Sequence, residues 1–242
     1  MSFYGSWFFG DIIQGQQGRD IIAYHGFVMM VMIAVLVMVL YMGTVVLVSK
    51  ATYRYFLNRQ RLEFWWTLIP MILLTGLWFP SMKNLYVVDE VKTPRWNFKA
   101  VGKQWYWSYE FCPSVHPIKK VSSDSSDWTR IIDSYMMSKG EVMENKGYRL
   151  LDVDNRMVAP AGVQMTCYVT SSDVLHSFAL PKLLLKVDAI PGRINRLPMK
   201  VSQSCVLYGQ CSEICGVNHS FMPIVIEFIP EKYFVKWMDA HL

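Results

Sequence analysis

The sequence predicts two membrane-spanning helices followed by one external domain built mainly of β-strands. Three observations indicate this class. Residues 21–49 and 64–82 contain no Asp, Glu, Lys or Arg. From about residue 83 onward the chain changes to short runs rich in aromatic and β-branched residues, separated by turn signals, which is typical of an all-β sandwich or barrel. With 52% hydrophobic residues, the chain is also more apolar than an ordinary soluble protein.

The two uncharged runs are long enough to cross a bilayer. A helix over 21–49 would be roughly 43 Å long, which exceeds the hydrocarbon core and allows a tilted span. The run 64–82 is just long enough, and Pro70 inside it would kink the helix without preventing the span. Because residues 1–20 are aromatic and polar and the first apolar run is long, we expect two retained helices and no cleavable signal peptide.

The connection between the two runs is basic. Its charged residues are Lys50, Arg54, Arg59, Arg61 and Glu63. Residues 1–20 carry no comparable excess of Lys and Arg, so the positive-inside rule places the connection in the cytoplasm or matrix and both termini on the opposite side. We therefore expect an external N-terminal segment over 1–20, a transmembrane helical hairpin over 21–82 and one external domain over 83–242.

The external domain reads as a set of strands. Its strand-like runs are VKTPRWNFKAVGKQWYWSYEF (91–111), VQMTCYVTSSDVLHSFALP (163–181), CVLYGQC (205–211) and MPIVIEFIP (222–230). Turn signals such as Pro191-Gly192 separate them. The polar stretch 119–130 has little to bury and is expected to be a surface loop, whereas EKYFVKWMDAHL (231–242) has the apolar spacing of a short amphipathic helix.

One loop near the C-terminus, CSEICGVNHSFM over 211–222, gathers side chains that bind soft metals. Its potential ligands, together with one histidine upstream, are His176, Cys211, Cys215, His219 and Met222. A disulfide between the two cysteines would leave the remaining donors unexplained. A structural zinc site could use the two cysteines and two histidines, but zinc seldom takes a thioether ligand.

Copper fits this donor set best. Thiolate and thioether are soft donors that favour Cu(I), and a His/Cys set with a weak Met is typical of electron-transfer copper in a β-domain. A mononuclear site of that kind needs only one cysteine. Two thiolates from one loop can bridge two copper ions, and sharing one electron over both metals reduces the change in bond lengths at each, which favours fast electron transfer.

Several segments of the chain together resemble subunit II of cytochrome c oxidase, the haem-copper terminal oxidase of respiration. They are GQCSEICGVNHSFMPIVIE, DVLHSFALP, VDAIPGRIN, LLDVDNR and QWYWSYEF. The resemblance covers nearly the whole chain. It implies that the external domain is a cupredoxin-like Greek-key barrel, and that the partners are a lipid bilayer, subunit I, the other oxidase subunits and cytochrome c, with no nucleic acid.

The same resemblance implies a dinuclear CuA centre with two copper ions. In that centre Cys211 and Cys215 bridge the metals, His176 and His219 are terminal ligands, and Met222 is a weak ligand. The backbone carbonyl of Glu213 completes the copper site. The carboxylate of Glu213 stands where the family binds a magnesium ion shared with subunit I; the residue alone would be read as a solvated loop acid.

Electron uptake is also implied by the resemblance. Trp105 matches the exposed residue at which the family receives electrons from cytochrome c, although an aromatic strand by itself most often indicates core packing. Glu110 and Asp173 stand at acidic docking positions. Two features depart from the family: the external domain carries more basic than acidic residues, and the stretch between Glu110 and Asp133 is longer than usual. The longer stretch could reshape the docking face or contact an additional subunit.

Glu63 opens the second apolar run in the segment RLEFWWTLIP. An acid at a membrane boundary is usually only interfacial. The resemblance implies a further role for Glu63, at the mouth of a proton pathway into subunit I. The remaining cysteines, Cys112, Cys167 and Cys205, have no ligand spacing, and the last two are expected to be buried thiols.

Three functions follow from these observations. The leading one is an electron-accepting subunit that passes electrons from cytochrome c to haem in subunit I, where oxygen is reduced to water with proton pumping. Nitrous oxide reductase has a similar copper loop but also a large propeller domain, and metal-free oxidase subunits lack the ligands. The expected location is the mitochondrial inner membrane, with both termini and the copper domain on the intermembrane-space side; the alternative is a bacterial plasma membrane.

Overall fold

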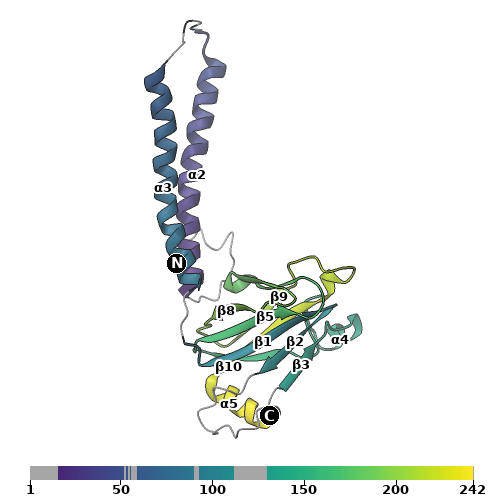
Figure 1. Ribbon diagram of the computed structural model, residues 1–242. Coiled ribbons are helices and arrows are strands. Elements are labelled where there is room, and N and C mark those ends of the chain that lie inside the picture. The colour runs from purple at the N-terminus through teal and green to yellow at the C-terminus, as the bar shows by residue number, and fades with distance from the viewer. Residues whose placement is uncertain are drawn as a thin grey trace. The chain divides into compact units, whose positions relative to one another are not determined.

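The computed structural model describes residues 16–51, 53, 55, 59–89, 93–111 and 130–241 (Figure 1). The described chain divides into a helical unit, which reaches Asp89, and a second unit made mainly of strands, which follows it. Each unit is described by itself below. Cys112 and most of the long stretch between Glu110 and Asp133 lie outside the described residues.

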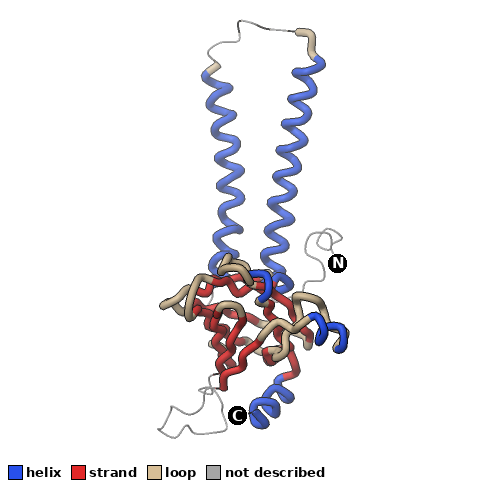
Figure 2. Tube along the Cα trace, turned by 90° about the vertical axis from the view of Figure 1, so that its right-hand side faces the viewer, coloured by secondary structure: helices blue, strands red, loops and turns tan. Residues whose placement is uncertain are grey.

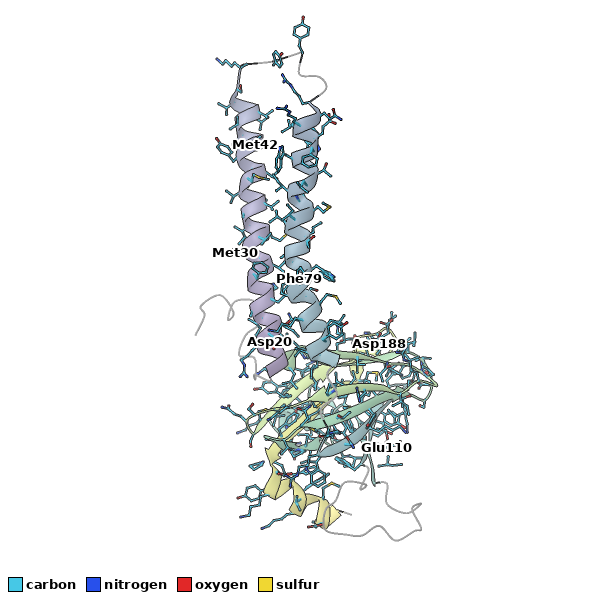
Figure 3. All side chains as sticks on the ribbon, turned by 60° about the vertical axis from the view of Figure 1, so that its left-hand side comes forward. Asp20, Met30, Met42, Phe79, Glu110 and Asp188 are labelled. Carbon is cyan, nitrogen blue, oxygen red and sulfur yellow. The ribbon has the colours of Figure 1, made fainter. Side chains whose placement is uncertain are left out.

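Two long helices form the helical unit, α2 (Gln16–Val48) and α3 (Gln60–Asp89). Both are long and apolar enough to cross a membrane: an 18-residue window within Gly18–Val48 has a mean hydropathy of 2.8, and one within Gln60–Val88 has a mean hydropathy of 1.4. Apolar side chains along them are exposed in the isolated chain, among them Met30, Met42 and Phe79 (Figure 3). An apolar surface of this extent is stable only against lipid or other apolar helices.

The helix α3 extends beyond its uncharged run at both ends, whereas α2 begins before its run and ends at Val48. Inside α3, Pro70 and Pro80 are accommodated without ending the helix. The two helices contact one another through polar groups near their ends: Tyr24 Oη donates to the carbonyl of Leu77 at 3.4 Å, and Asn84 Nδ2 donates to the carbonyl of Asp20 at 3.5 Å. These bonds indicate a paired helical hairpin.

Ten strands form three sheets in the second unit, which we call the β domain. The five-stranded sheet has the order β3-β2-β1-β5-β8, the three-stranded sheet the order β4-β10-β9, and the third sheet pairs β6 with β7. The bounds are β1 Trp96–Lys103, β2 Tyr106–Phe111, β3 Arg130–Ser134, β4 Met157–Ala161, β5 Met165–Ser171, β6 His176–Leu180, β7 Leu185–Ala189, β8 Asn195–Met199, β9 Cys205–Gln210 and β10 Pro223–Pro230.

Short helices complete the β domain. They are α4 (Lys139–Glu144), the 3₁₀ turns η1 (Pro181–Leu183) and η2 (His219–Phe221), and α5 (Glu231–His241). Figure 2 shows the strands gathered in one body with α5 at its margin. The predicted class, a helical hairpin followed by an all-β domain, is confirmed. Over the described residues the strands form three separate sheets and not one closed barrel.

The core of the β domain lies between the sheets and is rich in aromatic residues. Its largest fully buried side chains include Phe98, Trp107, Tyr109, Phe178 and Phe228. Burying each such side chain contributes about 1.5–3 kcal/mol to folding. Buried residues alternate with less buried ones over the first half of β1, as expected for a strand with one face toward a core, whereas in β2 Ser108 between Trp107 and Tyr109 is also buried.

The C-terminal helix α5 covers one end of this core. Phe234 is buried and meets Trp96 edge-on, with ring centroids 5.0 Å apart. Glu231 anchors the start of the helix because it accepts a 2.9 Å hydrogen bond from Trp96 Nε1 and pairs with Arg95 at 2.7 Å. The amphipathic helix expected at 231–242 is therefore present, although Tyr233 on its predicted apolar face is exposed.

Candidate metal centre

The loop with the predicted ligands, residues 211–222, is called the donor loop below. It joins β9 to β10, and its base is closed because Gln210 and Pro223 are paired in the antiparallel ladder. The N–H of Ser212 donates a 3.1 Å hydrogen bond to the carbonyl of Ser177, the second residue of β6. The start of the donor loop is thereby held beside the strand that begins with the upstream histidine.

The five predicted ligand side chains converge. His176 Nδ1 lies 3.9 Å from Cys211 Sγ. Cys215 Sγ lies 3.5 Å from both His219 Nδ1 and Met222 Sδ. The ligand atoms of His176, Cys211 and Cys215 all lie within 4.8 Å of one another, and the three residues are buried. A strand and a loop 35 positions apart in the sequence thus bring together a compact group of sulfur and nitrogen donors.

The two thiols of the donor loop are free and differ in acidity. Burial raises the pKa of Cys211, but hydrogen bonds with His176 and with the backbone of Ser177 and Glu213 outweigh it and lower the pKa to about 7. Burial and the neighbouring charge of Cys211 raise the pKa of Cys215. One thiolate forms readily and the second requires a compensating positive charge, which is what a bound metal ion supplies.

The ring of His176 is enclosed on several sides. Its Nε2 lies 2.8 Å from Asp173 Oδ1, and because a carboxylate accepts, Nε2 donates this hydrogen bond while Nδ1 faces Cys211. A Cβ added at Gly102 would come within 2.9 Å of the ring, so only glycine fits there. Trp107 meets the ring edge-on, with centroids 6.0 Å apart. His176 is therefore fully buried and held in one orientation.

Burial lowers the pKa of His176, but the contacts with Cys211 and Asp173 raise it more, and the net direction is upward. Burial likewise raises the pKa of Asp173, whereas the bonds to His176 and to the backbone of Val174 and Gln104 lower it more strongly. The hydrogen bond between Asp173 and His176 thus favours the charged form of each side chain.

The turn between β1 and β2 lies against the donor loop. Gln104 donates two hydrogen bonds, from its backbone N–H to Asp173 Oδ2 at 2.6 Å and from Nε2 to the carbonyl of Cys215 at 2.9 Å. The indole of Trp105 packs on Gly216, where an added Cβ would lie 3.2 Å from the ring. Gly216 has φ of +126°, a conformation that favours glycine.

His219 is less enclosed than His176. It lies at the start of η2 and is half-buried, and its backbone N–H donates to the carbonyl of Gly216 at 3.2 Å. Two neighbours on the donor loop, Ile214 and Val217, are 78% and 84% exposed.

The other residues singled out from the sequence lie in varied settings. Glu213 is half-buried, and its carbonyl oxygen lies 3.3 Å from Cys211 Sγ. Glu110, labelled in Figure 3, pairs with Lys99 across the β1–β2 ladder at 2.9 Å. Trp105 is half-buried rather than fully exposed. Glu63 lies in the first turn of α3, in the helical unit.

Four residues near the centre had no role in the sequence analysis: Gly102, Gln104, Ser171 and Gly216. The hydroxyl of Ser171 is buried and bonds the carbonyls of Gly102, at 3.2 Å, and Val174. Glycine next to a ligand, as in Cys215-Gly216, is a weak sequence signal for close backbone approach. Nothing local in the sequence marks Gln104, because its partners Asp173 and Cys215 are 69 and 111 positions away.

Cys167 is fully buried in the core, as expected, whereas Cys205 at the start of β9 is only half-buried. Burial raises the pKa of both thiols. Among the described residues, the one group of His, Cys, Asp and Glu with metal-binding spacing is His176, Cys211 and Cys215. This group, with two sulfurs and a nitrogen, is a candidate copper-binding site.

Family models match both parts of the chain. The model described as cytochrome c oxidase subunit II, periplasmic domain, matches residues 96–229, and the transmembrane-domain model of the same subunit matches residues 15–84. The chain is 70% identical over 240 residues to cytochrome c oxidase subunit 2 of Mytilus edulis, which covers 99% of each chain. It is 45% identical over 221 residues to that of Metridium senile, covering 91% of this chain and 84% of the relative.

A solved structure agrees with these matches. The crystal structure of the periplasmic domain of subunit II of cytochrome oxidase of Bradyrhizobium japonicum is 39% identical to the chain, with a TM-score of 0.52. The match covers 63% of this chain and 96% of that domain. The sequence matches and the structural match therefore indicate the same family.

Proposed function

The chain belongs to the cytochrome c oxidase subunit II family and is a membrane-embedded subunit of a haem-copper oxidase complex, and from this premise we propose that it is the electron-accepting subunit of that complex. Electrons from reduced cytochrome c would arrive at the donor loop and pass to haem in subunit I, where oxygen is reduced to water and protons are pumped. The observation that carries the proposal is the buried convergence of His176, Cys211 and Cys215.

The residues present fit a dinuclear copper centre. Each thiol has an imidazole nitrogen within 4 Å and one further donor: the carbonyl of Glu213 at 3.3 Å from Cys211, and Met222 Sδ at 3.5 Å from Cys215. We propose Cys211 and Cys215 as bridging ligands. The terminal and weak ligands would be His176, His219, Met222 and the Glu213 carbonyl. Two copper ions bound there would accept one electron at a time and share it.

The protein's own contribution is a rigid and dry set of donors. Cys211, Cys215 and Met222 are at least 93% buried, and His176 is fully buried, so water has little access. The ring of His176 is fixed by Asp173 and Trp107. Donors that cannot move change their geometry little between oxidation states, and a small change favours fast electron transfer.

Trp105 is proposed as the residue that receives electrons from reduced cytochrome c. Its indole lies against Gly216, which directly follows Cys215 in the chain. A route of one packing contact followed by covalent bonds therefore leads from the indole to Cys215 through a single residue, Gly216. The half-buried setting of Trp105 leaves part of the side chain accessible to a docked partner.

Glu110 and Asp173 are proposed to contribute to docking of the basic cytochrome c. Their environment limits this contribution, because Glu110 is paired with Lys99 and the carboxylate of Asp173 accepts bonds from His176 and Gln104. Docking would then depend on contacts close to Trp105 more than on a long-range field.

Three further assignments are proposed from family membership. The carboxylate of Glu213 would bind a magnesium ion together with subunit I. Glu63 would receive protons at the mouth of a pathway into subunit I, since a carboxyl group can take up and release protons. The protein would reside in the mitochondrial inner membrane with its copper domain on the intermembrane-space side; a bacterial plasma membrane is the alternative. The marked similarity to the Mytilus edulis chain favours the mitochondrial location.

Metal analysis combined with EPR spectroscopy tests the proposed function. The full chain, purified in detergent and supplied with copper, should hold two copper ions and give the hyperfine pattern of one electron shared between two equivalent nuclei. One zinc ion, or the signal of a mononuclear copper, would overturn the proposal. The same preparation should be reduced by ferrocytochrome c.

A further inference from the structure

The turn between β1 and β2 is held on the donor loop by a set of contacts centred on Gln104. Its backbone N–H donates to Asp173 Oδ2 at 2.6 Å, and Asp173 Oδ1 in turn lies 2.8 Å from His176 Nε2. Its side-chain Nε2 donates to the carbonyl of Cys215 at 2.9 Å. Gln104 thus connects two segments of the centre: it bonds Cys215 on the donor loop directly, and it reaches His176 through Asp173.

The neighbouring indole is placed by the same contacts. Trp105 directly follows Gln104, and its ring atoms would lie 3.2–3.3 Å from a Cβ at Gly216; Gln104 Nε2 would lie 3.4 Å from the same position. The amide and the indole therefore cover the Cα of Gly216 together. Within the described part of the chain, Trp105 Nε1 is buried and has no hydrogen-bond partner, so the indole has no polar anchor of its own.

We propose that Gln104 is a positioning residue for electron uptake: its side-chain hydrogen bond to the Cys215 carbonyl holds the Trp105 indole in contact with the donor loop. The inference rests on the proposed function, in which Trp105 accepts electrons for a copper centre that includes Cys215. It adds a residue whose side chain neither binds the metal nor needs to touch cytochrome c.

The physical argument concerns distance and its variation. The rate of electron transfer through a protein falls steeply with each additional gap between donor and acceptor, so an indole that can lift from Gly216 transfers electrons slowly. A single hydrogen bond to a backbone carbonyl contributes only about 1 kcal/mol, which is enough to favour one orientation of a surface turn. Loss of this bond would therefore lower the rate by increasing the gap between the indole and the donor loop.

The alternative role for Gln104 is docking, because its side chain is also exposed and could offer an amide to cytochrome c. The two roles predict different kinetics. A docking residue changes the concentration of cytochrome c needed for half-maximal rate. A positioning residue changes the limiting rate in the bound complex and leaves that concentration nearly constant.

The test uses Gln104→Met in the assembled oxidase. Methionine has a similar length but cannot donate the bond, and the backbone N–H of residue 104 remains. We expect the limiting rate of copper reduction by ferrocytochrome c to fall about tenfold, with the half-saturating concentration changed less than twofold. The EPR signal, and the rate of reduction by a small inorganic complex such as hexaammineruthenium(II), should stay as in the parent.

Two matched variants separate the possibilities. Gln203→Met, at an exposed glutamine outside the segments of the site, should leave all rates unchanged. Gln104→Asn keeps an exposed amide but is too short to reach the Cys215 carbonyl. A positioning role predicts that it behaves like Gln104→Met, and a docking role predicts that it behaves like the parent.

A further measurement does not depend on activity. Hydrogen exchange followed by mass spectrometry on the metal-free full chain should show faster exchange in the turn around residues 104–106 for Gln104→Met than for the parent. An unchanged limiting rate, a raised half-saturating concentration alone, or unchanged exchange in the turn would each overturn the inference. The proposed function fails separately, if the parent oxidase itself shows no copper signal or no reduction by ferrocytochrome c.

Discussion

The two histidines of the centre stand in opposite settings. His176 begins a strand and is fully buried. Its ring contacts Asp173 and Trp107, and it lies close to the backbone at Gly102, which has no side chain. His219 begins a short 3₁₀ turn in the donor loop, and it is only half-buried. His176 is therefore oriented by the fold before any metal binds, whereas the orientation of His219 depends on the donor loop.

The largest expected effect comes from removing either imidazole. His176→Gly and His219→Gly should each lose the EPR signal of a shared electron, because each removes a proposed terminal ligand. Added imidazole at millimolar concentration should restore copper binding in His219→Gly, since that position is open to solvent. It should not restore His176→Gly, whose cavity is enclosed. Equal recovery of the EPR signal in both variants would contradict the difference in solvent access between His176 and His219.

Trp105, in the turn before β2, and Trp107, within β2, allow the same comparison between the two sides of the centre. Trp105→Ala, on the side of Cys215, should slow electron uptake from ferrocytochrome c about 100-fold or more while the copper spectrum stays nearly intact. Trp105→Phe should recover only part of the rate, because it keeps a ring without the indole. Stopped-flow reduction of the assembled oxidase measures both. Loss of copper in the alanine variant would instead identify Trp105 as a core residue.

Trp107 lies on the His176 side and is fully buried. Trp107→Ala should therefore destabilise the fold by about 3–5 kcal/mol, which is the usual cost of deleting a large buried aromatic side chain. Thermal and denaturant unfolding of the full chain measures this loss. A destabilisation comparable to that of Trp105→Ala would contradict the assignment of one tryptophan to the core and the other to the surface.

Glycine substitutions test how tightly the His176 side is enclosed. Gly102→Ala places a methyl group within 2.9 Å of the His176 ring, so the ring or the strand must shift. We expect a loss of about 1–3 kcal/mol in the free energy of unfolding and an altered copper spectrum. Gly140→Ala, in α4, meets no atom within 4 Å and is the control; it should stabilise the chain by about 0.4–1 kcal/mol. Equal stability of the two variants would show that the space beside His176 is not tight.

The smallest effect on the copper centre is expected from the helical unit. Glu63→Gln keeps the size of the side chain but cannot take up and release protons, so turnover of the assembled oxidase should slow about 10²-fold or more if Glu63 feeds a proton pathway. The EPR spectrum and the rate of copper reduction should stay as in the parent. Full turnover across the neutral pH range would leave Glu63 as an interfacial acid.

Local patterns in the sequence determined the class of each part of the chain. Uncharged runs long enough to cross a bilayer require helices in a membrane, and α2 and α3 form over these runs. The aromatic and β-branched residues of 91–111 predicted strands, and β1 and β2 lie within that range. The types of side chain at 211–222 indicated soft-metal chemistry before any coordinates, because thiolate, thioether and imidazole form a narrow chemical class.

Tertiary structure alone decided which atoms meet. No local signal relates Gly102 to His176 or Gln104 to Cys215, because sheet registry and loop packing place them together across 74 and 111 positions of sequence. The pairing of Glu110 with Lys99, which lowers its value as a docking charge, likewise follows from the register of β1 and β2. Periodicity specifies how a segment folds against its own neighbours along the chain. Contacts between distant segments depend on the free energy of packing the whole domain, and no single stretch of residues encodes that sum.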